Sequence, residues 1–235
     1  MARGFGSGPS CFPRACSRAR LTREQCKRHA AVVQEQEWVV FDLETTGLSP
    51  DRDDIIQIAA VRMRGWRVLH SESFATYVNP GRPIPPFISS YTGIRQADVR
   101  GAPTPAEALG AFSRWAGSST LVAHNGHRFD MRFVEATCRR GGCGIRSVKY
   151  HDSLALSWQL WGRRGVRHGL DAVLGRLKLT STDDRRHDAR GDVALLGRAI
   201  EAMRHELLRR GEEPTLPIHG GMLPETTGES EPFGS

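Results

Sequence analysis

The segment 38–44, WVVFDLE, constrains the fold of this chain more than any other feature. An uninterrupted apolar run with β-branched residues is typical of a central strand buried on both faces, whereas a strand with one wet face alternates apolar and polar side chains. The run ends in two carboxylates, Asp42 and Glu44. We therefore expect the folded region to begin at Glu37 and to cover this strand with helices.

Two further strands are predicted directly after this one. Residues 55–63 and 66–78 are separated only by a turn at Arg64-Gly65, and hairpin-like spacing makes the first three strands antiparallel neighbours. Strands and helices then alternate. The strands expected there are 120–124 and 147–152, and the helices are 105–116, 129–142, 153–161, 168–177 and 189–210. This order predicts an α/β fold with a mixed central sheet of about five strands, flanked by helices.

The charge of the chain is unevenly distributed. The net charge over 235 residues is +7, but residues 1–36 carry +5 and residues 211–235 carry −5. The tails offset each other, so the basic excess belongs to residues 37–210. We predict one folded domain over 37–210, preceded by a basic N-terminal extension. Because 211–235 is rich in Gly, Pro, Thr and Glu and lacks periodicity, we predict a disordered acidic tail there.

The composition excludes two classes of protein. No apolar run approaches the roughly 18 residues that span a bilayer, which excludes an integral membrane protein. Five cysteines without a CxxC pair argue against a disulfide-stapled secreted scaffold and for a reducing compartment. Residues 1–20 contain no acid and fit an organelle transit peptide or, equally, a disordered extension. We expect an intracellular protein, in a chloroplast or mitochondrion in the first case and in the nucleus or cytoplasm in the second.

Asp42 and Glu44 are two residues apart at the end of the predicted strand. Side chains alternate along a strand, so the two carboxylates project to the same side. Each disfavours ionisation of the other. A divalent cation such as Mg²⁺ or Mn²⁺ removes this conflict, because hard cations prefer oxygen ligands. Taken alone, the pair also fits a solvated strand end.

Three other residues are ambiguous when each is taken alone. Asp130 opens a predicted helix directly after strand 120–124, where the helix dipole favours negative charge. Asp192 lies early in the last predicted helix, and His187 precedes it in a polar loop. Each of the three also fits an ordinary structural or surface position.

Together, these residues resemble the motifs of a known family, the DEDDh three-prime-to-five-prime exonucleases of the proofreading-exonuclease superfamily. FDLETTGL resembles the first motif, with Asp42 and Glu44; AHNGHRFD resembles the second, with Asp130; HDARGD resembles the third, with His187 and Asp192. The resemblance covers about residues 37–205 in the expected order. It implies a ribonuclease H-like fold and an exonuclease domain over 37–210.

The subtype follows from two further details of the motifs. The related tyrosine class would place Tyr four residues before the last Asp, where this chain has Asp188, so the histidine class is favoured. The HNGxRFD spacing is one residue longer than the commoner HNxxFD form. In this the chain is similar to the three-prime repair exonucleases and the plant organellar exonucleases.

The resemblance implies two-metal hydrolysis of phosphodiesters. Two Mg²⁺ ions, for which Mn²⁺ can substitute, would lie about 3.5–4 Å apart and clamp the attacking and leaving oxygens. Asp42 would bridge both metals. Glu44 and Asp192 would complete one site, and Asp130 would hold the other partly through water. His187 would act as general base on the attacking water.

Five residues are expected to bind substrate by the same resemblance: Thr45, Leu48, Tyr91, Asn125 and Arg128. Thr45 would contact the terminal 3′ nucleotide, and Leu48 would pack against its base. Asn125 would position the substrate or the loop of the second motif. For Leu48, Tyr91 and Arg128, a purely structural place is the alternative.

The expected activity is hydrolysis of terminal phosphodiesters from the 3′ end, releasing nucleoside 5′-monophosphates. DNA is the favoured substrate, in repair, turnover or proofreading. An exoribonuclease and a nucleic-acid-binding proofreading subunit of a polymerase are the alternatives. Only 7% of the residues are aromatic, so a single-stranded 3′ end entering a pocket fits better than an extended stacking platform. A homodimer and a polymerase partner are compatible with the family, whereas no membrane partner is expected.

Overall fold

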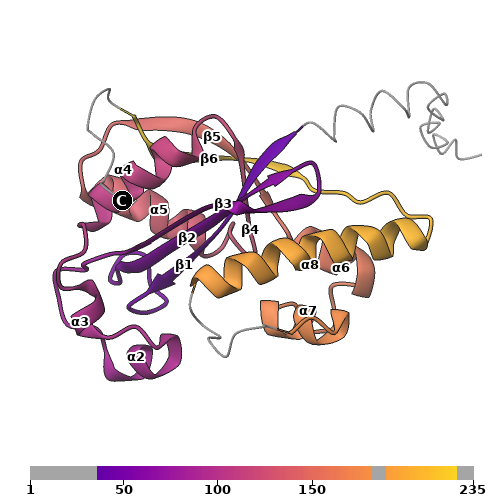
Figure 1. The fold of residues 1–235 in the computed structure, drawn as a ribbon, viewed down its shortest axis with the longest axis horizontal. Coiled ribbons are helices and arrows are strands. Elements are labelled where there is room, and N and C mark those ends of the chain that lie inside the picture. Colours follow the sequence, from indigo (N-terminus) through magenta and orange to yellow (C-terminus); the bar gives the residue numbers. More distant parts are fainter. Residues whose placement is uncertain (1–35, 181–188, 227–235) are drawn as a thin grey trace, which may run out of the picture.

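The computed structural model describes residues 36–180 and 189–226, which are built on a six-stranded sheet (Figure 1). The strands are β1 (Glu37–Thr45), β2 (Ile55–Arg64), β3 (Arg67–Tyr77), β4 (Thr120–Ala123), β5 (Ile145–Asp152) and β6 (Ile218–Pro224). The helices are α2 (Pro86–Thr92), α3 (Gln96–Val99), α4 (Pro105–Ala116), α5 (Asp130–Arg140), α6 (Leu154–Trp161), α7 (Leu170–Leu177) and α8 (Ala189–Arg209). The predicted extension or transit peptide up to residue 35, the predicted base His187 and residues 227–235 lie outside the described residues.

The strand order is β3-β2-β1-β4-β5-β6, which places β1 inside the sheet. β1, β2 and β3 are antiparallel neighbours, as predicted. β4 runs parallel to β1, and β5 runs parallel to β4. The predicted mixed α/β sheet is therefore confirmed, with six strands in place of about five.

The sixth strand lies in a segment for which we predicted disorder. β6 pairs antiparallel with β5 from Ile145↔Pro224 to His151↔Ile218, and Leu223 is fully buried. The prediction of a disordered tail over 211–235 is therefore wrong for residues 211–226. The sequence IHGGMLP has two glycines and no clear alternation, so its strand conformation depends on a tertiary partner that local pattern does not reveal.

Alternate side chains of β1 enter two different hydrophobic cores. The side chains that pack with α4 and α5 are Val39, Phe41 and Leu43, and those that pack with α6, α7 and α8 are Trp38 and Val40. All five are at most 4% exposed, which confirms the predicted burial of this strand on both faces. Asp42 and Glu44 follow Trp38 and Val40 at every second position of β1. Their side chains therefore point to the side of the sheet that α8 covers.

β1 extends beyond its parallel neighbour. β4 pairs with β1 only from Trp38↔Thr120 to Val40↔Val122, whereas the pairing with β2 continues to Thr45. The sheet is therefore open on the β4 side of the last part of β1. In open α/β sheets, ligands bind at crevices outside the carboxyl ends of parallel strands.

A small third core holds α2 and α3 against β2. Its buried members are Ile56, Ile84, Ile88, Ile94 and Val99. This packing places α2 beside the carboxyl end of β1, as Figure 1 shows. α2 thus forms a wall next to the two carboxylates of that strand.

Candidate active site

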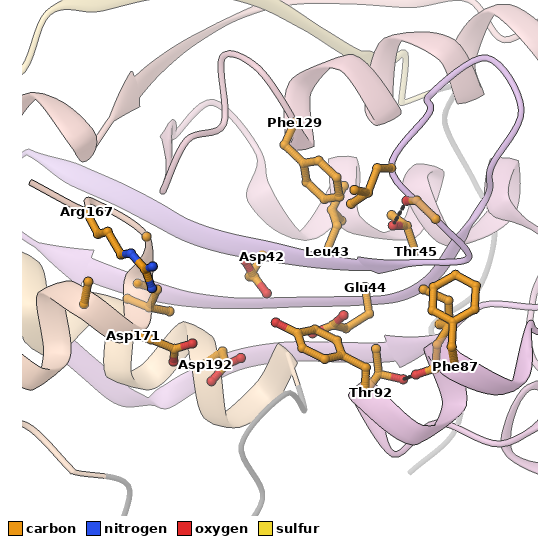
Figure 2. A pocket seen from close by; sticks show the side chains of 17 residues that line it. Asp42, Leu43, Glu44, Thr45, Phe87, Thr92, Phe129, Arg167, Asp171 and Asp192 are labelled. Carbon is orange, nitrogen blue, oxygen red and sulfur yellow. Dashed lines mark hydrogen bonds between the residues drawn. The ribbon is translucent and has the colours of Figure 1, made fainter.

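Three carboxylates gather at the carboxyl end of β1. Asp42, Glu44 and Asp192 each offer an oxygen, and these oxygens all lie within 4.8 Å of one another. Figure 2 shows the three side chains directed toward a common centre. Carboxylates this close repel one another unless a proton or a cation lies between them.

Asp192 reaches this centre because α8 packs along the sheet. Val193, Leu196 and Ile200 are at most 3% exposed and bury one face of the helix in the core that it shares with β1 and β2. Asp192, in the first turn, is 6% exposed. The helix therefore carries this carboxylate over the face of β1 from which Asp42 and Glu44 project.

Asp130 begins α5 directly behind the cluster and is 2% exposed. Burial, with the charge of Asp152, raises its pKa to about 7, although backbone hydrogen bonds from Asp130 itself and from Leu43 act in the opposite direction. Within residues 36–180 and 189–226, its Oδ1 atom has no hydrogen-bond partner. A buried carboxylate oxygen of this kind fits a position that receives a cation or a water bound to one.

The pKa of Asp42 is raised well above its ordinary value. Burial is the main cause, and the charges of Asp130, Glu44 and Asp192 add to it. Asp42, Glu44 and Asp192 form the cluster within 4.8 Å, and Asp130 lies outside that cluster but close enough for its charge to raise the pKa of Asp42. All four donors are hard oxygens, so the set fits divalent cations such as Mg²⁺ or Mn²⁺.

The loop between β4 and α5 is held by Asp152, a carboxylate that was not predicted from the sequence as a site residue. Asp152, 8% exposed, accepts backbone hydrogen bonds from Asn125 (2.9 Å), His127 (3.2 Å) and Leu154 (3.0 Å). Its position offers a signal, because Asp152 is the last residue of β5 and lies two residues before Leu154, where α6 begins. Its role is structural, since it fixes the backbone that leads to Asp130.

Asn125 and His124 belong to the same loop. Asn125 has φ = 65°, a left-handed conformation that asparagine tolerates better than most residues. His124 is hydrogen-bonded through Nδ1 to the Ser153 hydroxyl (2.8 Å) and through Nε2 to the His168 carbonyl (2.6 Å). Burial lowers the pKa of His124, which favours the neutral ring. These two residues shape the loop, and neither lines the cleft described next.

A cleft of about 1000 Å³ opens over the carboxylates. Asp42, Glu44 and Asp192 line its floor (Figure 2). Large apolar side chains stand at its rim: Leu48 is 83% exposed, Phe87 68% and Tyr91 59%. Exposed apolar groups gathered around a charged floor are typical of a binding site.

The predicted substrate-binding residues fall into two groups. Thr45, Leu48 and Tyr91 line the cleft, and the Thr45 hydroxyl donates a hydrogen bond to the Gly47 carbonyl (2.6 Å). Asn125 and Arg128 are not among the lining residues. Arg128 instead lines two smaller hollows beside β6.

Several residues that line the cleft were not predicted as site residues, among them Phe87, Arg167 and Asp171. Phe87 comes from α2, Arg167 comes from the segment between α6 and α7, and Asp171 comes from the first turn of α7. Figure 2 shows Arg167 reaching toward the acidic side of the cleft. An exposed arginine here offers a charge and a fork of donors suited to phosphate. The place of these three side chains depends on how α2 and α7 pack in the folded protein.

The family model of the RNase T exonucleases matches residues 39–199. A DNA polymerase III subunit epsilon-like protein of Rhodobacter capsulatus is 39% identical over 189 residues, which cover 80% of this chain and 26% of that protein. A DNA polymerase III of PolC type from Caldanaerobacter subterraneus is 40% identical over 127 residues, covering 54% of this chain and 9% of that protein. The chain thus spans about a quarter or less of the length of these curated relatives.

Solved structures share the fold at low sequence identity. The nuclease domain of 3′hExo, a DEDDh family member bound to rAMP, has a TM-score of 0.63 and 19% identity, covering 78% of this chain and 96% of that chain. Exonuclease X in complex with 5′ overhanging duplex DNA has a TM-score of 0.56 and 22% identity, covering 72% and 92%.

A ribonuclease H-like sheet with a carboxylate cluster at the open end of its central strand defines a nuclease. The chain belongs to the RNase T exonuclease family, which confirms the resemblance found in its motifs. The closer likeness to three-prime repair and plant organellar exonucleases stays a prediction. In the described part of the chain, every helix is too short or too polar to cross a bilayer.

Proposed function

We propose that this protein is a metal-dependent 3′–5′ exonuclease that removes nucleotides one at a time from the 3′ end of DNA. The proposal rests above all on the meeting of Asp42, Glu44 and Asp192 in one cleft, with their oxygens within 4.8 Å of one another. Water would add to the terminal phosphorus, and the bond from phosphorus to the preceding 3′ oxygen would break. The products are a nucleoside 5′-monophosphate and a strand shortened by one residue.

The residues divide this work among them. Asp42, Glu44, Asp130 and Asp192 would hold two divalent cations, for which Mg²⁺ is our choice, and these would supply neutralisation of the phosphate charge and activation of water. His187 would accept the proton of the attacking water at an imidazole nitrogen. Arg167, at the edge of the cleft, would hold a phosphate oxygen of the strand.

The rim of the cleft explains why the enzyme would act on an end. Leu48 stands on the loop after β1, and Phe87 and Tyr91 stand on α2. A terminal base can enter between these apolar side chains, with Thr45 near its sugar. Because a paired base would have to leave its helix to enter, single-stranded 3′ ends are the preferred substrate.

Digestion of a 5′-labelled single-stranded DNA oligonucleotide with Mg²⁺ tests the proposal. We expect a ladder of strands shortened from the 3′ end, with release of mononucleotides, and protection of a strand whose last linkage is a phosphorothioate. Asp42→Asn should be inactive. Asp51→Asn is the matched control, because Asp51 is an exposed aspartate outside the cleft. Endonucleolytic products, or cleavage that survives in Asp42→Asn, would contradict the proposal.

Two observations favour related functions. The likeness to a polymerase III subunit epsilon-like protein favours a proofreading role, which co-purification of a polymerase from native extract would reveal. The likeness to 3′hExo bound to rAMP favours an exoribonuclease. Competition between DNA and RNA strands of equal sequence separates these substrates, since the protein must distinguish them at the 2′ position.

A further inference from the structure

Two arginines and two aspartates hold the loop that carries Leu48. Arg82 Nε lies 2.8 Å from Asp54 Oδ2, and Arg82 Nη2 donates a hydrogen bond to the Thr46 hydroxyl (2.9 Å). Arg140 Nη2 lies 3.0 Å from Asp54 Oδ1. Each oxygen of the Asp54 carboxylate thus contacts a different guanidinium group. The side chains of Arg82 and Arg140 are 40% and 39% exposed. We call this network the loop clamp: Arg82, Arg140, Asp53 and Asp54.

The clamp joins parts of the chain that are far apart in sequence. The loop 46–54 follows β1, Arg82 lies between β3 and α2, and Arg140 is the last residue of α5. Arg82 lies four residues before Pro86, where α2 begins, so its contacts join the loop to the segment that leads into α2. Its own segment is fixed by Asn79, which accepts a hydrogen bond from the Gly81 N–H (3.0 Å) and donates one to the Arg100 carbonyl (3.3 Å).

The loop itself is tightly closed around Asp53. The Asp53 carboxylate accepts a hydrogen bond from the Ser49 N–H (2.9 Å), and Arg82 Nη2 lies 3.4 Å from it. A Cβ atom added at Gly47 would come within 2.5 Å of the same carboxylate. Leu48 therefore stands between two residues whose positions depend on Asp53, and the loop can shift little while the clamp is intact.

Neither arginine lines the cleft, so neither would contact substrate there. Partly exposed ion pairs also contribute little to stability. The clamp instead fixes the relative positions of the segments that it joins, because one guanidinium group can donate to acceptors on two segments at once. Its effect falls on the loop that carries Leu48 and on the segment that leads to α2, which carries Phe87.

We propose that Arg82 and Arg140 are positioning residues that set the width of the slot for the terminal nucleotide. The inference rests on the proposed function, and it deepens that function by assigning the control of substrate fit to residues outside the cleft. The carboxylates are held separately, since β1 keeps Asp42 and Glu44 in register with β2. Loosening the clamp should therefore weaken substrate binding more than it slows chemistry.

Steady-state kinetics on single-stranded DNA test this separation. Arg82→Gln and Arg140→Gln should each raise KM about tenfold with kcat within about twofold, because small misplacements of a substrate-positioning group have large effects. Arg82→Lys should behave like Arg82→Gln, since an ammonium group cannot replace the fork. The matched control is Arg62→Gln. Arg62 also joins two segments, through the Trp115 carbonyl and the Ser119 hydroxyl, but lies outside the cleft, and its loss should leave KM unchanged.

A double substitution shows whether Arg82 acts through Leu48. Leu48→Ala should itself raise KM, and adding Arg82→Gln should then change KM by less than about twofold, as expected for residues that share one effect. A further tenfold rise in KM in the double variant would overturn the proposal. So would an unchanged KM in Arg82→Gln, or a loss in kcat alone that parallels a lower melting temperature.

Hydrogen exchange measures the clamp without any substrate. The backbone N–H groups of Thr46 and Asp53 are hydrogen-bonded within the loop, at 2.8 Å and 2.7 Å. Exchange at both should accelerate in Arg82→Gln and not in Arg62→Gln; equal protection in the wild type and Arg82→Gln would overturn the proposal. If the wild type releases no mononucleotides, the proposed function fails, and the exchange result still decides whether the clamp holds the loop.

Discussion

Asp130 and Asp152 are both buried aspartates near the loop between β4 and α5, but their surroundings differ. They are 2% and 8% exposed. Asp152 accepts three backbone hydrogen bonds and holds residues 125–127 in place. Asp130 has an oxygen without a partner among the described residues, and its pKa is raised to about 7.

The difference shows how two identical side chains acquire different roles. Burying a carboxylate costs free energy unless hydrogen-bond donors compensate for the lost water. For Asp152 the loop supplies these donors, so the residue stabilises the fold. For Asp130 the compensation is incomplete, which leaves a carboxylate that gains from a proton or a cation. The same Asp→Asn substitution should therefore have opposite effects at the two positions.

The largest expected effect is the loss of activity in Asp130→Asn. Removing one carboxylate of the metal-binding set should lower the rate by about three orders of magnitude. Asp192→Asn should do the same while keeping the fold. Rates are measured by mononucleotide release, with Glu135→Gln as a control on the exposed face of α5. Nearly wild-type turnover in either variant would remove that residue from the proposed metal site.

Next in size is the dependence of stability on pH in the absence of metal. The folded state holds a proton on Asp130 up to about pH 7, whereas the unfolded chain releases it near pH 4. The unfolded state then binds fewer protons between these values, so the free energy of unfolding should fall as pH rises, on the order of 3 kcal/mol in total. Urea denaturation with a chelator present measures this. Asp130→Asn should reduce the fall in stability, and the fall that remains belongs to Asp42, whose pKa is raised as well. A rise through the same window would contradict the assignment.

Asp152→Asn should destabilise the protein by about 2 kcal/mol, because an amide accepts fewer of the three backbone hydrogen bonds and carries no charge. In the same urea experiment at pH 8 without metal, Asp130→Asn should be as stable as the wild type or more so. The two variants together show whether Asp130 and Asp152 contribute differently to the free energy of unfolding. If both lose stability equally, the two aspartates have the same structural role.

The smallest expected effect is the stabilisation by Mg²⁺. Binding at about ten times the dissociation constant should raise the melting temperature by about 3 °C. The shift should be larger at pH 8 than at pH 5.5, since protons compete for the carboxylates. Asp192→Asn should show little shift, whereas Asp152→Asn should retain most of it. An undiminished shift in Asp192→Asn would place the cation elsewhere.

Local pattern was sufficient for part of the site. The alternation along β1 predicted that Asp42 and Glu44 share a side, and the apolar spacing of 189–210 predicted the helix that carries Asp192. Both depend on interactions within a few residues or on simple periodicity, which a sequence displays directly.

Other parts depend on contacts that no local pattern encodes. Asp152 bonds to backbone groups at residues 125 and 127, far back in the sequence, and any residue type could supply those N–H groups. Phe87 and Arg167 line the cleft because α2 packs against β2 and α7 packs against α8. β6 is a strand because β5 offers it an edge. In each case the missing information was the position of a distant backbone.

The pairing of β6 has a practical consequence for work with shortened forms of the protein. A chain that ends at residue 210, the predicted domain boundary, would leave the β5 edge unpaired and remove Leu223 from the core. It would also remove the Pro224 carbonyl that accepts a hydrogen bond from the Ser113 hydroxyl of α4 (2.7 Å). Bare strand edges pair with other chains and promote aggregation. Insolubility of such a truncated form would then report the missing strand and would carry no information about the nuclease site.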